Sequence, residues 1–108
     1  HEKITVPKIL KSSDHIFQLY TIRLPEKEIR DELHDFLTKR RIFSKVYFSP
    51  IHLTYFYKKQ FGTQKSDLPK TEELSDQVLT LPLYPNMTKE EKELLINTIS
   101  EFFESDNN

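Results

Sequence analysis

Cysteine is absent from the chain, and glycine is nearly absent. Without cysteine the chain can hold no disulfide scaffold, no cysteine nucleophile and no thiolate metal site. Its single glycine, Gly62, compares with about seven or eight expected at the average usage of roughly 7%. Glycine-rich phosphate-binding loops need several such residues, because their backbone approaches the phosphates closely. The Walker A loop and the dinucleotide-binding fingerprint are therefore both excluded.

The chain also lacks an excess of positive charge and a long apolar run. Its 16 lysine and arginine residues are balanced by 17 aspartate and glutamate residues, whereas nucleic-acid modules usually carry a clear basic excess. No segment approaches the roughly 20 apolar residues that span a bilayer, and the N-terminus does not resemble a secretory signal. We therefore expect a cytoplasmic domain with no nucleic-acid partner and no membrane partner.

Aromatic residues, in contrast, are plentiful. Eight Phe and five Tyr in 108 residues are not the composition of a disordered tail. The length fits one domain, since domains usually contain about 50 to 250 residues. Three segments rich in β-branched and aromatic residues indicate strands, at 15–24, 42–48 and 78–83. The sequence therefore predicts an α+β fold with a small, mostly antiparallel three-stranded sheet and helices packed on it.

Helices are expected between and after these strands. Apolar residues at helical spacing predict an amphipathic helix of about four turns after Pro25, and Thr88 and Glu91 form a capping box before the final helix. Shorter helices are predicted within 51–61 and 71–77, separated by a surface loop at 62–70. The domain is expected to span 15–104, preceded by an extended or helical lead-in at 1–14 and followed by a frayed tail at 105–108.

Few residues suggest chemistry. His15, His34 and His52 do not have the spacing of metal ligands, so no metal site is predicted. The basic residues 39–41 and Lys45 suit either an anionic ligand or a solvated helix end. The aromatic stretch 47–57 has polar tips that suit a pocket for a sugar or an interface with another domain. These patterns alone leave the function open.

Five short motifs follow one another between His15 and Phe103. They are HIFQLYTIRL at 15–24, Arg30-Asp31-x-Leu33, IFSKVYFSPIH at 42–52, Leu68-Pro69-x-Thr71-Glu72 with Ser75, and Leu81-Pro82-Leu83-Tyr84-Pro85 with Met87-Thr88. In this order and spacing they resemble the C-terminal small domain of the DegT-type (DegT/DnrJ/StrS) sugar aminotransferases. These are pyridoxal phosphate (PLP) enzymes of the aspartate-aminotransferase fold. Each motif is weak by itself, but the order of all five makes the resemblance specific.

Two departures from the family pattern stand out. Arg41 occupies a position where the family usually has glycine in a left-handed turn, which costs a non-glycine residue roughly 1 kcal/mol. Tyr47-Phe48 stands where the family often has His-Tyr, so a ligand contact by that histidine is not expected here.

The resemblance implies a function for the parent enzyme rather than for this chain alone. Such an enzyme transfers an amino group to a nucleotide-linked keto sugar, in cell-surface polysaccharide or deoxyamino-sugar biosynthesis, although some relatives use the cofactor for dehydration. The family places PLP and its lysine in a large N-terminal domain, so no cofactor is expected in this chain and the chain alone should be inactive. The implied partners are that domain, the nucleotide sugar and a second subunit of a homodimer. The substrate-binding residues implied here are His52, Pro50 and Tyr47.

Two other interpretations compete with this one. One is a free-standing interaction or regulatory module of the same fold, which would have a closed polar surface. The other is an unrelated small-molecule sensor, which would bind a ligand tightly. A domain separated from a larger enzyme would instead leave an uncovered hydrophobic face.

Overall fold

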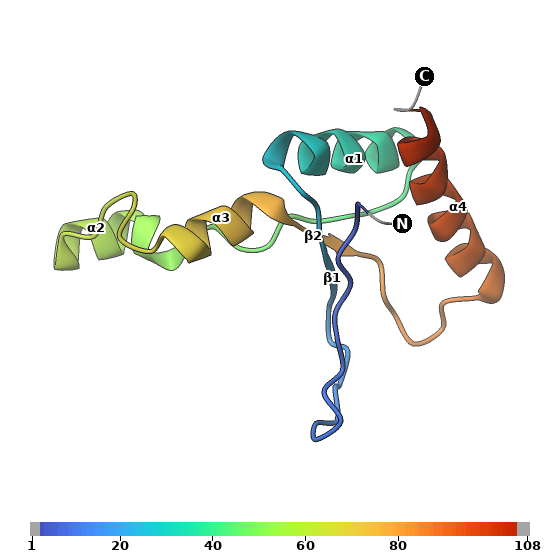
Figure 1. The fold of residues 1–108 in the computed structure, drawn as a ribbon, viewed down its shortest axis with the longest axis horizontal. Helices are drawn as coiled ribbons and strands as arrows, with labels where there is room; N and C mark the ends of the chain where they lie inside the picture. The colour runs from blue at the N-terminus through green and yellow to red at the C-terminus, as the bar shows by residue number, and fades with distance from the viewer. Residues whose placement is uncertain (1–2, 106–108) are drawn as a thin grey trace.

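The computed structural model describes residues 3–105 of the chain, which form an α+β arrangement of two strands, four α-helices and one 3-10 helix. Figure 1 shows α1 above the strands and α4 beside them, with the C-terminal end of α4 next to α1, while α2 and α3 lead away to the other side. The elements in chain order are β1 (Tyr20–Arg23), α1 (Lys27–Lys39), η1 (Ile51–Leu53), α2 (Tyr55–Phe61), α3 (Pro69–Gln77), β2 (Val78–Leu81) and α4 (Lys89–Ser105).

The sheet consists of β1 and β2, which pair antiparallel with Tyr20 opposite Leu81. The expected three-stranded sheet is not confirmed, because only Lys45 of the segment 42–48 pairs with β2. Lys45 exchanges two backbone hydrogen bonds with Thr80, of 2.9 and 2.8 Å. Residues before Lys45 close the end of α1, and Pro50 after it lacks the N–H that a longer strand would need. On the other side of the sheet, Thr5 from the lead-in forms a similar single bridge to Arg23.

The hydrophobic core lies where α1 and α4 cover the sheet. Leu33 and Leu37 of α1 and Phe103 of α4 are completely buried. The rings of Phe36 and Phe102 pack edge to face with centroids 5.3 Å apart, which joins the two helices directly. The predicted apolar stripe of α1 is therefore confirmed, with Phe36 and Ile29 only partly buried at its margin. The eight buried hydrophobic residues are Ile22, Leu24, Leu33, Leu37, Leu79, Leu81, Phe102 and Phe103.

Helix α4 begins with a recognisable local motif, and α1 ends with one. The capping box of α4 is confirmed, because the Thr88 amide donates to the Glu91 carboxylate at 2.8 Å and the Glu91 amide donates to the Thr88 hydroxyl at 3.1 Å. At the end of α1 the amides of Ile42 and Arg41 donate to the carbonyls of Leu37 and Thr38, both at 3.0 Å. These two bonds make a Schellman turn, and Arg41 adopts its left-handed conformation with φ 60°. The turn is thus kept although glycine is replaced by arginine.

Arg30 explains one of the sequence motifs. Its side chain is buried, and its Nη1 donates to the carbonyl oxygens of Ser75 at 3.1 Å and Val78 at 3.3 Å. Its Nε donates to the Asp31 carboxylate at 2.6 Å, which balances the buried charge. Arg30 therefore joins α1 to the point where α3 ends and β2 begins, and a cation suits the negative end of α3.

The molecule is more extended than a self-contained domain of this length. Its radius of gyration is 16.2 Å, compared with about 13 Å for a compact chain of this length. Its accessible surface is 8473 Å², about a third more than the roughly 6,300 Å² expected for a monomer of this mass. Figure 1 shows the sources of the excess: α2 and α3 project from the core on one side, and the lead-in forms a long loop on another.

The predicted ends of the chain are only partly described. The lead-in is extended around Thr5 and turns where the Ser13 amide donates to the Leu10 carbonyl at 3.1 Å. Of the predicted tail at 105–108, Ser105 is the last residue of α4, and 106–108 lie outside the described residues. Among residues 3–105, no helix is long and apolar enough to cross a membrane.

Candidate functional site

The candidate site is built on the residues 47–52, called here the proline turn. The chain leaves the sheet after Lys45 and enters η1 through Pro50, whose carbonyl accepts a hydrogen bond from the Leu53 amide at 2.9 Å. Tyr47 is half-buried, and the Nζ of Lys45 lies 4.8 Å from the centre of its ring. Phe48 and Ile51 of the turn are exposed, at 72% and 62%. The proline turn therefore presents apolar side chains outward while Tyr47 and Pro50 are partly packed beneath.

His52 is placed differently from what the sequence suggested. Its neighbourhood of aromatic residues indicated an exposed edge, but the side chain is only 6% exposed. The ring Nε2 lies 2.9 Å from the Oε1 atom of Glu72 on α3. Its own backbone carbonyl accepts a hydrogen bond from the Thr63 hydroxyl at 2.5 Å. His52 is therefore a fixed, buried connection between η1, the loop after α2, and α3.

The protonation pattern of this pair follows from its geometry. An ionised carboxylate only accepts hydrogen bonds, so the proton between the two side chains is on Nε2 of His52. This bond is the main reason why the pKa of Glu72 lies below its ordinary value of 4.5; burial opposes the effect, and the Ser66 amide adds to it. The other ring nitrogen, Nδ1, is buried without a hydrogen-bond partner among the described residues. Unpaired buried atoms of this kind are rare. Because Nδ1 has no such partner, the hydrogen bond from Nε2 to Glu72 is the one that orients the ring.

Beyond the proline turn lies an aromatic arm, defined as residues 54–68 and comprising α2 and the loop after it. None of the seven residues of α2 is buried. Gly62 ends the helix in the left-handed conformation, with φ 67°, which is the position where the sole glycine of the chain is required. Four aromatic side chains of α2 are exposed to solvent by 78%, 61%, 38% and 64%: Tyr55, Phe56, Tyr57 and Phe61.

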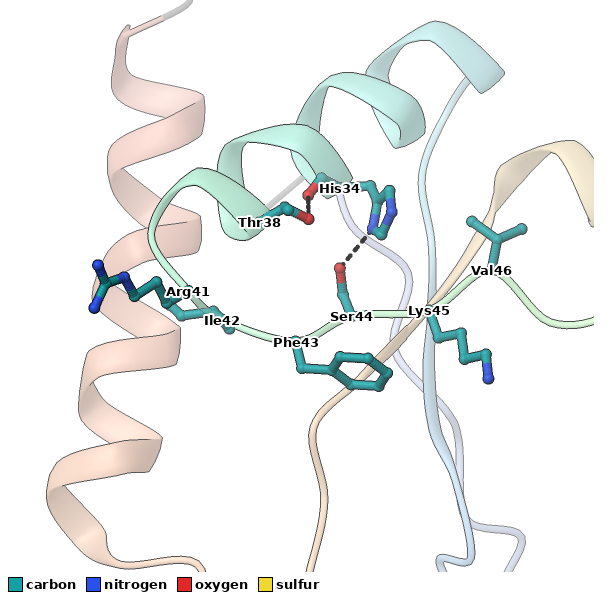
Figure 2. Close-up of a pocket in the computed structure, with 8 residues that line it drawn as sticks. All are labelled: His34, Thr38, Arg41, Ile42, Phe43, Ser44, Lys45 and Val46. Carbon is teal, nitrogen blue, oxygen red and sulfur yellow. Dashed lines mark hydrogen bonds between the residues drawn. The ribbon is translucent and has the colours of Figure 1, made fainter.

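A hollow of about 570 Å³ lies between α1 and residues 41–46. Figure 2 shows the His34 ring directed at Ser44, with its Nδ1 2.8 Å from the buried serine hydroxyl. The figure also shows the side chains of Arg41 and Lys45 extending to opposite sides of this hollow. They do not converge on one anion, so the basic residues that the sequence singled out form no phosphate site here. The Arg40 side chain is paired with Glu101 instead, at 2.5 Å.

The structure thus places the three predicted site residues in one turn, with Tyr47 and Pro50 half-buried and His52 buried. Sequence reasoning missed Glu72, which lies twenty residues after His52 in a different helix. A signal for it was present, since Glu72 belongs to the Leu68-Pro69-x-Thr71-Glu72 motif, but the spacing gave no reason to connect this motif with the proline turn.

The residues present do not form a place for PLP by themselves. Such a cofactor needs a lysine enclosed in a cavity, yet all twelve lysines of the chain are exposed, including Lys45 at the open hollow described above. Within the described part of the chain, no group of three or more histidine or carboxylate side chains could hold a metal ion. The arrangement of the described residues therefore suits the positioning and covering of a ligand.

A model of the DegT/DnrJ/EryC1/StrS aminotransferase family matches residues 1–100. The chain belongs to this family. It spans about a quarter of the length of the curated relatives that it matches, because the shared region is 26% of each of them. The five ordered motifs are thus explained by common descent, and the resemblance noted from the sequence is confirmed.

Individual relatives illustrate the range of the family. The pleiotropic regulatory protein of Geobacillus stearothermophilus is 33% identical over 101 residues, which are 93% of this chain and 26% of that protein. The spore coat polysaccharide biosynthesis protein SpsC of Bacillus subtilis is 27% identical over 100 residues, which are 89% of this chain and 26% of that protein. The putative sugar aminotransferase Spr1654 of Streptococcus pneumoniae, in its PMP form, superimposes with a TM-score of 0.85 and 25% identity, over 95% of this chain and 26% of that one.

Proposed function

We propose that this chain is the C-terminal small domain of a PLP-dependent enzyme that transfers an amino group to a nucleotide-linked keto sugar. The observation that carries the proposal is the family match across residues 1–100, combined with the chain's quarter share of its relatives. The name of SpsC supports a role in polysaccharide biosynthesis, and the description of Spr1654 supports a sugar as the amino acceptor.

The shape of the chain supports a missing partner domain. The surface in excess of a compact monomer is about 2,000 Å², which is more than twice the roughly 800 Å² that each partner buries in an interface of standard size. Exposed aromatic residues cluster on the aromatic arm and the proline turn, where Tyr55, Phe48 and Phe61 are each more than 60% exposed. Exposed apolar patches of this kind mark interaction sites. We therefore propose the large N-terminal PLP domain of the same protein as the partner, in a homodimeric parent enzyme.

In this proposal the chain's residues bind and exclude water, and they carry no covalent step. PLP, held in the large domain, supplies the electron sink for amino transfer. The proline turn lies at the mouth of the sugar site, where Tyr47 and Pro50 border the ligand and His52 completes the turn. The exposed Phe48 and Ile51 shield the reacting end of the sugar from solvent, which strengthens the electrostatic contacts inside the site.

The test begins with the complete native protein that carries this chain. We expect a mass about three to four times 13.0 kDa, release of PLP on denaturation, and transfer of ¹⁵N from labelled glutamate to a nucleotide-linked keto sugar. The same assay detects dehydration as loss of water from the sugar without nitrogen transfer. A native mass near 13.0 kDa without bound PLP would contradict the proposal and favour a free-standing regulatory module.

A further inference from the structure

The aromatic arm is not held in position by its own helix stability or by buried apolar side chains. Its helix is seven residues long and contains no buried side chain, whereas isolated helices shorter than about 12 to 15 residues are marginal in water. The loop after the helix contains a second left-handed residue, Ser66, with φ 77°. Since neither helix propensity nor apolar burial fixes the arm, its direction depends on specific hydrogen bonds.

Three of these bonds meet around His52 and Glu72. The Thr63 hydroxyl donates to the His52 carbonyl at 2.5 Å, and the His52 ring donates to Glu72 Oε1 at 2.9 Å. The Ser66 amide donates to the same Oε1 atom at 2.8 Å. One carboxylate oxygen on α3 thus holds both ends of the arm, through His52 before α2 and through Ser66 after it.

This geometry also limits what His52 can do. Its Nε2 is occupied by Glu72, and its Nδ1 is buried within the chain. Neither nitrogen is therefore presented to a ligand. The side chain still influences the site, because His52 belongs to η1, follows Pro50 and Ile51 directly, and connects η1 to α3 through its hydrogen bond with Glu72.

We propose that Glu72 is a positioning residue, which acts through His52 and Ser66 to hold the proline turn and the aromatic arm at the angle needed for binding the sugar nucleotide. This inference rests on the proposed function for its effect on binding. The effect of Glu72 on the position of the arm follows from the contacts alone and is separately measurable.

The test uses pairs of substitutions in the complete protein. In His52→Gln the amide nitrogen can take the place of Nε2 and donate to Glu72, whereas in His52→Asn it takes the place of Nδ1. Glu72→Gln keeps an acceptor oxygen for both donors, and Glu72→Ala removes it. Glu73→Ala is the matched control, since Glu73 is the next residue of α3 and binds Lys70 and Arg23 instead.

We expect His52→Asn and Glu72→Ala to raise KM for the sugar nucleotide about tenfold, with kcat nearly unchanged, because each leaves a buried partner unpaired. Glu73→Ala should stay within about twofold of the parent protein. His52→Gln and Glu72→Gln, which keep the hydrogen bond, should each raise KM clearly less than His52→Asn and Glu72→Ala do. The double variant His52→Asn/Glu72→Ala should be no worse than either single variant, as expected for two residues that act as one unit.

Two results would overturn the inference. The opposite order of the histidine variants, with His52→Gln impaired and His52→Asn active, would show that Nδ1 contacts the ligand. Equal behaviour of Glu72→Ala and Glu73→Ala would show that Glu72 positions nothing. If the complete protein transfers no amino group, the proposed function fails. Hydrogen exchange at the Ser66 amide still tests whether Glu72 holds the arm in position. Its exchange rate should rise at least tenfold in Glu72→Ala and stay unchanged in Glu73→Ala and Glu72→Gln.

Discussion

The core and the aromatic arm of this molecule are stabilised in opposite ways. Around the sheet, α1 and α4 enclose eight buried hydrophobic residues, and the side chains of Leu33, Leu37 and Phe103 are fully removed from solvent. In the arm, the aromatic side chains of α2 face solvent, and the segment is held through the polar contacts of His52 and Glu72. The core explains why the chain folds, whereas the arm leaves its aromatic side chains exposed, as the proposed contact with a partner domain requires.

This contrast accounts for the high aromatic content of so small a domain. A chain that folds for itself alone places its largest hydrophobic side chains inside. Here Phe43, Phe48, Phe56 and Phe61 are all more than 60% exposed. Half of the eight phenylalanines are thus available for contact with a partner, which agrees with a domain that occupies a quarter of its relatives' length.

The sharpest test of the contrast compares two phenylalanines. Phe103→Ala removes a fully buried ring and should lower the free energy of unfolding by about 3 to 5 kcal/mol. Phe56→Ala removes a ring that is 61% exposed and should change this free energy by less than about 0.5 kcal/mol. Urea unfolding of residues 1–108 measures both. Similar losses for the two variants would show that the arm is a working part of the core.

A smaller effect is expected at the end of α1. Arg41 holds a left-handed conformation with φ 60°, which a side chain makes unfavourable by about 1 kcal/mol or somewhat more. Arg41→Gly should therefore raise the free energy of unfolding by about 1 kcal/mol, reduced in part by the greater entropy of glycine in the unfolded chain. Arg40→Gly, one residue earlier, has φ −94° and serves as the control that should be destabilising. A loss of stability in Arg41→Gly would mean that its side chain makes a compensating contact.

The smallest effect is a selective response of the arm to acid. The pKa of Glu72 is lowered in the folded chain, chiefly by its hydrogen bond with His52, so its contribution is complete above about pH 4.5 and is lost as the pH falls through the lowered value. In the complete protein, the protection factors of the Ser66 amide and the α2 amides should decline in this range. In Glu72→Gln the same factors should not change with pH.

Acid also destabilises other parts of the fold, because other carboxylates likewise have lowered pKa values in the folded chain. The pKa values of Glu73 and Glu91 are lowered as well, chiefly by the hydrogen bonds of the Lys70 side chain and the Thr88 amide, respectively. Burial raises the pKa of Asp31, but the hydrogen bonds and charges of Arg30 and Lys27 together lower it below its ordinary value. At pH values below about 4.5, the free energy of unfolding should therefore decrease in both the parent protein and Glu72→Gln. Arm protection that follows global stability in Glu72→Gln as closely as in the parent chain would contradict a specific role for this carboxylate.

Sequence reasoning predicted the parts of the fold that depend on local pattern. The apolar stripe of α1, the Thr88–Glu91 cap and the start of β2 at Val78 could each be predicted from a short stretch of sequence. The extent of strands was less predictable: only Tyr20–Arg23 of the expected strand 15–24 and only Lys45 of 42–48 pair with β2. Pairing depends on neighbours distant in the chain, which composition does not reveal.

The candidate site shows the same limit more strongly. His52 was singled out as a candidate binding residue of the turn, but its surroundings suggested exposure, whereas the structure buries it against Glu72 and Thr63 from other elements. For Arg30, which the sequence showed only as part of a motif, no pattern indicated burial; it is buried because two carbonyl groups at the end of α3 accept its hydrogen bonds. Polar residues that serve as long-range connections carry no periodicity by which a sequence could show them.

The central claim is that the core is self-sufficient while the aromatic arm is completed by the rest of the protein. Amide hydrogen exchange of residues 1–108, compared with the complete protein, tests this most directly. We expect the amides of α1, α4 and the sheet to be protected in both, and those of α2 to be protected only in the complete protein. Equal protection of α2 in both, or its rapid exchange in both, would contradict the claim.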